Sequence, residues 1–294
     1  MNLIKQKWQG FKKTLLQQAL KAEEKAAGLT RKHITLSFGQ VSYFEKAGHE
    51  PALILLHGAG ADKNTWCRFV KYLSGPQRII IPDLPGHGDS VQNLSLSYTI
   101  AQQALYLHEL LTRLNANPIH IAGHSMGGAI ALRYAHLYSQ GLQSLILIDA
   151  AGAEKTPSEM RQQIAQTGVH PFMAIESVAD YKNLVRYGMN KPPYIPGLFL
   201  NLLAADKISR REIERKVFND AMLDLDQTSV LPVLTPPVFI IWGKLDRIVH
   251  ADDAELLHEL LPDSQKIILD EIGHVPMVEA PQLTAQLCSK FWNR

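Results

Sequence analysis

The sequence predicts an α/β fold in which a mostly parallel central sheet is flanked by helices. Short runs rich in β-branched residues alternate along the chain with stretches of helical spacing. The later runs are apolar at consecutive positions, as strands covered on both faces must be. The 294 residues, of which 46% are hydrophobic and 20% charged, suffice for one large domain with an insertion. The repeated strand–helix order therefore indicates parallel strands between two layers of helices.

The first element is expected to be a hairpin, with strands at 34–38 and 41–44 separated by Gly39 and Gln40. The other expected strands are 52–56 (ALILL), 78–81 (RIII), 119–122 (IHIA), 144–148 (SLILI), 238–242 (VFIIW) and 266–269 (KIIL). Helical spacing occurs at 98–114, 126–138, 252–261 and 280–292. Two cysteines, Cys67 and Cys288, lie far apart in the sequence and are expected to be free, buried thiols.

Residues 151–231 interrupt this alternation after the sixth predicted strand. The segment is helical and loop-rich, and a block of this size between two core strands predicts a helical cap, or lid, over the edge of the sheet. The core then comprises residues 33–150 and 232–294. The Pro-rich apolar stretch 192–203 either lines a pocket or packs the insertion.

The N-terminal segment, residues 1–32, differs from the rest in charge. Residues 1–33 hold eight Lys or Arg and two Glu, a net +6, so the remainder carries −4 of the overall +2. A basic amphipathic helix is expected, with one apolar stripe formed by Ile4, Trp8, Phe11 and Leu15. This stripe either packs on the body or lies in the interface of an anionic membrane.

The charge pattern also bears on partners and location. Lysines interrupt any apolar run in the N-terminal segment, so no secretory signal peptide is recognised. No basic face is indicated outside that segment, which argues against a nucleic-acid partner. The expected location is cytoplasmic, with the option of peripheral contact at the inner face of a membrane, and the oligomeric state is left open.

The stretch 118–135 (PIHIAGHSMGGAIALRYA) holds the strongest functional pattern. Ser125 stands where an apolar strand turns directly into a helix, and such a turn holds its serine in a strained backbone that exposes the hydroxyl. Gly123 and Gly127 allow the chain to double back closely. The pattern therefore predicts a nucleophilic serine, and a purely structural tight turn is the alternative.

A serine nucleophile needs a base and a carboxylate that orients the base. His274 lies in DEIGHVPMVEAP, between the last predicted strand and the last helix, and is the expected base. Asp246, just beyond the strand VFIIW, is the expected acid, and the order serine, aspartate, histidine occurs in such triads. Asp149 also ends a strand and is the rival acid, whereas His124 is expected to point into the structure.

Backbone N–H groups are expected to hold the oxyanion that forms during acyl transfer. The N–H of Met126, the residue after the serine, is one donor. The loop HGAGADKNTW offers the second, with Ala59 preferred over Gly60. His57 is expected to shape this loop by hydrogen bonding. The residues predicted to bind substrate are His57, Gly58, Phe172, Tyr194, Leu198 and Val275.

The motifs HGAGADKNTW, DLPGHGDS, GHSMGG, GKLDRIV and GHVPMVE, in this order, resemble the α/β-hydrolase fold across residues 34–292. The pattern HGxGADKxxW, the stretch KPPYIP and the entry AGLTRKHI are similar to bacterial lipases and esterases akin to the monoacylglycerol-lipase-like branch. The resemblance implies a triad Ser125–Asp246–His274, no cofactor, and carboxylic esters of small to medium acyl chains as substrates. No HExxH, cysteine cluster or phosphate-binding loop occurs in the sequence, so no metal is expected.

Two alternatives share these motifs. The elbow also occurs in hydrolases of other bonds, namely C–C hydrolases of ring-cleavage products, thioesterases and perhydrolases, and a non-catalytic binding protein can share the fold. A C–C hydrolase is expected to offer polar or basic cap residues to an acidic substrate. The cap of this chain offers apolar ones instead: Phe172, Met173, Tyr194, Ile195, Leu198 and Phe199.

Overall fold

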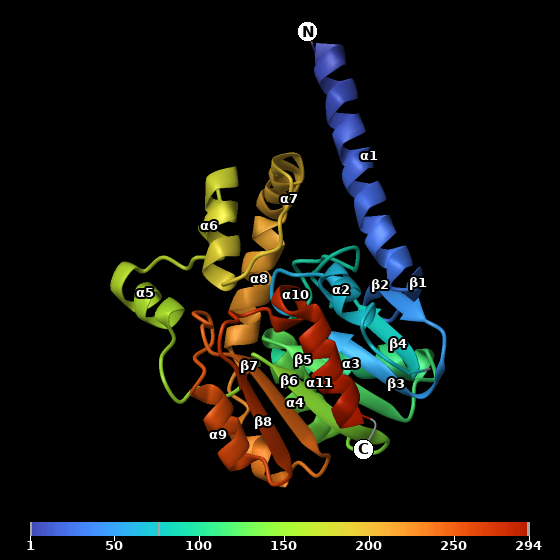
Figure 1. The fold of residues 1–294 in the computed structure, drawn as a ribbon, viewed down its shortest axis with the longest axis vertical. Coiled ribbons are helices and arrows are strands. Elements are labelled where there is room, and N and C mark those ends of the chain that lie inside the picture. Colours follow the sequence, from blue (N-terminus) through green and yellow to red (C-terminus); the bar gives the residue numbers. More distant parts are fainter. Residues whose placement is uncertain (1, 76, 293–294) are drawn as a thin grey trace.

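The computed structural model describes residues 2–75 and 77–292, with side chains described from residue 10 onward. An eight-stranded sheet crosses the molecule in the order β1-β2-β4-β3-β5-β6-β7-β8 (Figure 1). Its strands are β1 (Thr30–Leu36), β2 (Gly39–Lys46), β3 (His49–Leu56), β4 (Gln77–Pro82), β5 (Ile119–His124), β6 (Leu142–Ile148), β7 (Val238–Gly243) and β8 (Ser264–Leu269). The pairs β1–β2 and β2–β4 are antiparallel, and the other pairs are parallel. The predicted fold class is therefore confirmed.

The first hairpin turns earlier than the sequence predicts. Leu36 pairs with Gly39, so the two-residue turn is Ser37 and Phe38 rather than Gly39 and Gln40. The sequence predicts that Phe38 ends the first strand, but its ring packs against Tyr106 of α3 (Ile100–Arg113) with 4.1 Å between centroids. Gly39 has φ +134°, and a Cβ there would lie 2.7 Å from the Val91 side chain, so this glycine serves a close approach inside β2.

Two apolar cores lie on opposite faces of the sheet. One face is covered by α3 (Ile100–Arg113), α4 (Met126–Leu137) and α9 (Asp253–Leu260). The other is covered by the short α2 (Cys67–Val70), α10 (Pro276–Glu279) and α11 (Pro281–Trp292), preceded by the 3-10 turn η1 (Lys63–Trp66). Cys67 and Cys288 are both buried and unpaired in this second core. Strands covered on both faces explain the consecutive apolar residues in the sequence.

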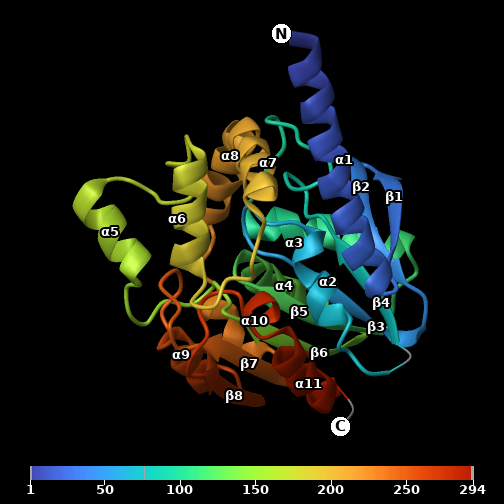
Figure 2. The same ribbon diagram turned by 45° about the horizontal axis from the view of Figure 1, so that its top comes forward.

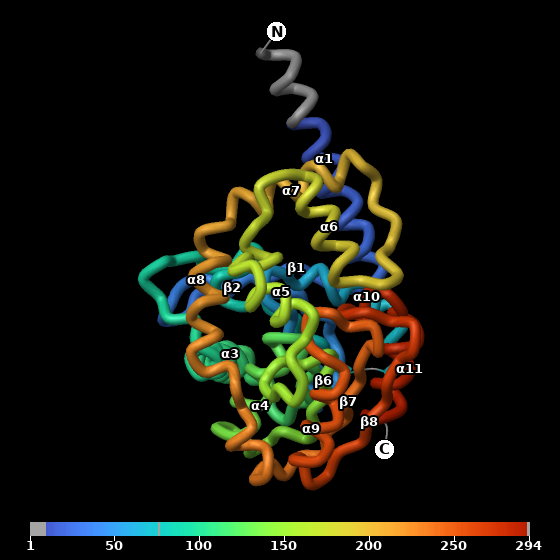
Figure 3. Tube along the Cα trace, turned by 90° about the vertical axis from the view of Figure 1, so that its left-hand side faces the viewer, coloured from blue at the N-terminus to red at the C-terminus, as the bar shows by residue number. Residues whose placement is uncertain are grey.

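Four helices lie between β6 and β7: α5 (Glu159–Thr167), α6 (Val178–Gly188), α7 (Gly197–Ser209) and α8 (Arg211–Met222), followed by the 3-10 turn η2 (Thr228–Val233). We refer to α5–α8 as the inserted helices. Ser177 and Asp180 form a reciprocal capping box that fixes where α6 begins. Figures 2 and 3 show α6 and α7 at the same end of the molecule as α1, with α9 at the opposite end.

Helix α1 (Asn2–Ala26) extends from the body (Figure 1) and packs with its later turns against α2 and α7. Leu16, Ala19 and Leu20 line the large cavity described below. Of the predicted apolar stripe, the side chains of Ile4 and Trp8 lie outside the described part, Phe11 is 56% exposed and Leu15 is half-buried. Within the described residues, no helix combines the length and apolarity that crossing a bilayer requires.

Candidate active site

Ser125 stands at the tip of a sharp turn between β5 and α4. Its backbone has φ +52° and ψ −122°, a strained conformation for a residue with a side chain. A Cβ on Gly123 would lie 2.3 Å from the carbonyl oxygen of Gly127, and a Cβ on Gly127 would lie 2.6 Å from that of Leu56. The chain therefore doubles back as the sequence predicts, and glycine is required on both sides of the serine.

His274 and Asp246 meet through a short hydrogen bond. His274 lies between β8 and α10, Asp246 lies beyond the end of β7, and the imidazole Nδ1 is 2.6 Å from Asp246 Oδ2. The other oxygen of Asp246 accepts the backbone N–H groups of Ile248 and Val249 at 2.7 and 3.0 Å. Three donors therefore hold this carboxylate, and the side chains of both residues are nearly inaccessible to solvent.

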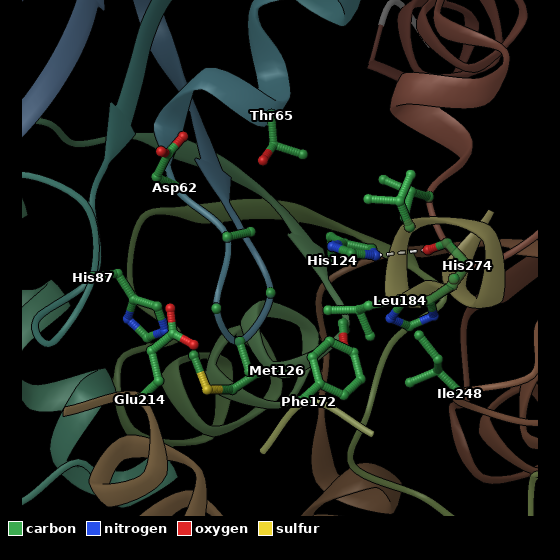
Figure 4. A pocket seen from close by; sticks show the side chains of 18 of the residues that line it. Asp62, Thr65, His87, His124, Met126, Phe172, Leu184, Glu214, Ile248 and His274 are labelled. Carbon is green, nitrogen blue, oxygen red and sulfur yellow. Dashed lines mark hydrogen bonds between the residues drawn. The ribbon is translucent and has the colours of Figure 1, made fainter. Parts of the chain in front are cut away.

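His124 faces the site rather than the interior, contrary to the expectation from the sequence. Its Nε2 donates to the backbone carbonyl of His274 at 2.7 Å (Figure 4). Burial, together with the neighbouring His274, lowers the pKa of His124 well below its usual value, so the ring is neutral. The His274 N–H in turn donates to the Gly188 carbonyl at the end of α6 at 2.8 Å. The backbone of His274, the predicted base, is thus held both by His124 of the elbow and by Gly188 of the inserted helices.

Ser125, His124 and His274 all line one cavity of about 1130 Å³. Most of its wall is apolar, and more than half of the lining residues come from α1 and from the segment between β6 and β7. Figure 4 shows Phe172, Leu184 and Ile248 near His274, with Met126, His87 and Glu214 grouped on the other side of the pocket. The two residues expected to be nucleophile and base therefore line the same, mainly apolar cavity.

The residues expected to supply the oxyanion donors lie beside the serine. Ala59, Gly58, Gly60 and Met126 all line the cavity. Met126 is the first residue of α4, so its N–H is one of the donors that a helix leaves without an internal partner. A Cβ on Gly58 would lie 2.9 Å from the Ser125 Cβ, which shows how closely this loop approaches the elbow.

Two buried contacts fix that loop from behind. His57 Nδ1 donates to the Gly58 carbonyl at 2.9 Å, while its Nε2 accepts the Leu84 N–H at 3.0 Å. Lys63, which is 1% exposed, forms ion pairs with Asp83 at 2.5 Å and with Asp89 at 2.9 Å. The loop after β3 is therefore tied to the loop after β4 by groups that do not face the cavity.

The expected substrate-binding residues divide into two groups. Gly58, Phe172, Tyr194 and Val275 line the cavity, and Tyr194, 88% exposed, lies toward solvent. His57 is fully buried and lies behind the wall, so the expectation of substrate contact is corrected to loop support, because both its ring nitrogens are already used. Leu198 lies outside the described lining, which on α7 includes Phe199 and Leu203 instead.

A charged corner of the cavity was not anticipated from the sequence. Lys207 of α7 and Glu214 of α8 form an ion pair of 2.7 Å, with side chains 10% and 15% exposed, and Lys207 also donates to the Gly60 carbonyl at 3.1 Å. His87 is 3% exposed, donates from Nδ1 to Pro85, and its Nε2 has no partner among the described residues. The charged run DKISRREIERK was the available signal in the sequence, although it does not indicate which of its residues reach the cavity.

The ionisation of this corner follows from its burial. Burial lowers the pKa of His87 well below its usual value, and the neighbouring His57 acts in the same direction. Burial also raises the pKa of Glu214, against the opposing effect of Lys207. The corner combines a hydrogen-bond acceptor on neutral His87 with the Lys207–Glu214 ion pair, a set of donors and acceptors suited to hydroxyl groups.

The fold and this geometry define the class of the protein. The family model described as the alpha/beta hydrolase fold matches residues 51–281, more than half of the chain, and the protein belongs to this family. The predicted resemblance is thereby confirmed.

Three individual proteins are similar to this chain over most of its length. Lipase 1 of Psychrobacter immobilis is 32% identical over 281 residues, covering 94% of this chain and 88% of its own. Monoacylglycerol lipase ABHD6 of Homo sapiens is 28% identical over 264 residues, covering 85% of this chain and 77% of its own. A crystal structure of a membrane phospholipase A, described as a novel bacterial virulence factor, has a TM-score of 0.92 at 30% identity, covering 96% of this chain and 92% of the other.

Proposed function

We propose that the protein is a serine carboxylic-ester hydrolase of the lipase and esterase type, acting through an acyl-enzyme on apolar esters of small to medium chain length. The observation that carries the proposal is the strained Ser125, which lines the same cavity as His274, together with the hydrogen bond between His274 and Asp246 behind it. Lipase relatives of about 30% identity over most of the chain support the same activity. Residues 151–231 are proposed to form the cap over this cavity.

Catalysis follows the chemistry of acyl transfer. His274 Nε2 takes the proton of Ser125 Oγ as the oxygen attacks the ester carbonyl carbon, and Asp246 stabilises the imidazolium through Nδ1. The backbone N–H groups of Ala59 and Met126 hold the negative oxygen of the tetrahedral intermediate. His274 then protonates the leaving alcohol, after which it activates a water that releases the acid from Ser125.

The lining of the cavity also bears on the alcohol part of the ester substrate. Its apolar wall suits an acyl chain, whereas the corner formed by Lys207, Glu214 and His87 suits hydroxyl groups. We therefore propose esters whose remaining part carries free hydroxyls, with monoacylglycerols as the leading class. A relative named as a monoacylglycerol lipase supports this choice.

Helix α1 is proposed to bring the enzyme to an anionic membrane surface. Lys12, Lys13, Lys21 and Lys25 lie along its described part, and the helix extends from the body (Figure 1). Leu16 and Leu20 on the same helix line the cavity. A lipid surface that binds α1 would therefore lie beside the cavity that takes the substrate.

The first prediction concerns the nucleophile. Ser125→Ala removes the attacking oxygen, so kcat on nitrophenyl esters of graded chain length falls by more than about 10³-fold. Ser139→Ala, an exposed serine beyond the far end of α4, serves as the matched control and keeps wild-type activity. Undiminished hydrolysis by Ser125→Ala, or turnover of a dienone acid with no turnover of any ester, would contradict the proposal.

The second prediction concerns the charged corner. Glu214→Gln weakens a charge-assisted hydrogen bond to the substrate, so kcat/KM falls about tenfold more for a monoglyceride than for the ethyl ester of the same acid. Glu212→Gln, exposed on the same helix, is expected to leave both substrates unaffected. An equal loss for both esters in Glu214→Gln would show that the corner supports the fold and does not bind the alcohol.

The third prediction concerns α1. In Lys12→Glu/Lys13→Glu, charge reversal lowers binding to mixed phosphatidylglycerol and phosphatidylcholine vesicles by more than about tenfold in sedimentation, since each basic side chain contributes about 1 kcal/mol at an anionic surface. Lys244→Glu/Lys290→Glu makes the same change in charge on the body, at two exposed lysines. Equal losses in the two variants would mean that total charge, and not α1, governs binding.

A further inference from the structure

A second buried carboxyl group lies against the acid of the proposed triad. Asp149 follows β6, is fully buried, and has φ +43°, a conformation that non-glycine residues adopt at a cost. One carboxylate oxygen of Asp149, one of Asp246 and one ring nitrogen of His274 lie within 4.8 Å of one another. The sequence offered Asp149 as the rival acid, and the structure places both aspartates at the same site.

The hydrogen-bond donors around the two carboxyl groups are unequal. Asp246 accepts from His274, Ile248 and Val249. Asp149 accepts at Oδ1 from the Gly243 N–H at 2.9 Å, and no donor in the described part of the chain reaches its Oδ2. Two carboxylates this close do not both ionise in a buried site, and the proton goes to the one that fewer donors stabilise.

A proton on Asp149 also accounts for its Oδ2, the buried oxygen that has no hydrogen-bond donor. Once protonated, Oδ2 becomes a donor, and the neighbouring Asp246 carboxylate is the acceptor available to it. Asp246 then has a fourth donor, while Gly243 keeps its acceptor on Asp149 Oδ1. Every polar atom of the pair is thereby satisfied, which buried polar groups in folded proteins require.

We propose that Asp149 is a positioning residue that stays protonated during catalysis and donates a hydrogen bond from Oδ2 to the Asp246 carboxylate, holding that carboxylate in place for His274. The inference rests on the proposed function, because Asp149 acts through Asp246 and does not touch the substrate. One negative charge, rather than two, then faces the imidazolium that forms on His274.

The groups around Asp149 favour the protonated form. Burial raises the pKa of Asp149 well above its usual value, and the negative charge of Asp246 acts in the same direction. Glu279 of α10 adds a smaller effect of the same sign, while the Gly243 N–H opposes it. Of the imidazoles, His274 is bonded to Asp246, and His124 is neutral with its ring centroid 4.7 Å from that of His274.

Two substitutions separate a hydrogen-bond role from a charge role. Asp149→Asn keeps a donor for Asp246 and an acceptor for Gly243, so kcat/KM is expected to stay within about threefold of wild type with the acid limb of its pH profile unmoved. Asp149→Gly removes both groups at a positive φ that glycine accepts. Its kcat is expected to fall roughly tenfold to a hundredfold. The acid limb of the pH profile of Asp149→Gly is expected to move to higher pH. With one donor fewer, the Asp246 carboxylate interacts more strongly with the His274 imidazolium, so His274 loses its proton at a higher pH.

An ionised Asp149 would give the opposite signature. Asp149→Asn would then remove a negative charge from beside His274, and the acid limb of kcat/KM would move to lower pH. A shift in that direction, or failure of Asp149→Asn to restore what Asp149→Gly loses, would overturn the proposal.

A measurement without substrate tests the proton directly. If Asp149 keeps its proton in the folded protein, the free energy of unfolding falls as pH rises above about 4, the pKa of an aspartate in the unfolded chain. The reason is that the unfolded chain releases this proton and the folded chain does not. The unfolding equilibrium constant of wild type relative to Asp149→Asn is therefore expected to rise about tenfold per pH unit above that point. A ratio independent of pH would refute the protonated form, whatever the Ser125→Ala variant shows about the activity.

Discussion

The crowding of backbone atoms at the elbow is the constraint on which the site depends. The carbonyl oxygen of Gly127 occupies the space that a side chain on Gly123 would need. This approach forces Ser125 to φ +52° and starts α4 immediately afterwards, with the Met126 N–H at the free end of the helix. Since β5 lies in the middle of the sheet, the turn is covered on both faces and has little freedom to relax.

Burial and hydrogen-bond donors together set the charges around the elbow. Burial lowers the pKa values of His57, His87 and His124, so three imidazoles near the serine remain neutral. The Asp246 carboxylate accepts hydrogen bonds from three donors, whereas the carboxyl group of its neighbour Asp149 accepts one. The site thus concentrates a single stabilised negative charge behind His274, in a cavity whose wall is mostly apolar. Such an environment strengthens each electrostatic interaction made during the reaction.

The elements around this site that lie where the sequence predicts them are those with local signals. Strand runs, the glycines around Ser125 and the loops that hold Asp246 and His274 are each recognisable within about ten residues. Other features depend on contacts between distant elements. The hairpin turn lies earlier than predicted because Phe38 packs on Tyr106 of α3. His57 lies behind the cavity because its Nε2 accepts a hydrogen bond from the Leu84 N–H.

The same limit applies to the cavity wall. Lys207 and Glu214 are separated from Gly60 by about 150 residues, and nothing in their local sequence indicates that they meet beside the loop after β3. Of the two neighbouring apolar residues that the sequence offers in the cap, Phe199 lines the cavity and Leu198 does not, because one residue rotates a side chain to a different face of α7. The lining of the cavity by α1 likewise arises from packing against α7.

The most direct measurement compares Gly123→Ala with Gly197→Ala. A Cβ at residue 123 meets backbone at 2.3 Å, whereas a Cβ at residue 197 meets nothing within 4 Å. Gly123→Ala is predicted to lower the free energy of unfolding by about 3 kcal/mol and to slow labelling of Ser125 by an alkyl phosphonate at least tenfold, with Gly197→Ala close to wild type in both. Wild-type stability and wild-type labelling in Gly123→Ala would contradict the central role of the elbow.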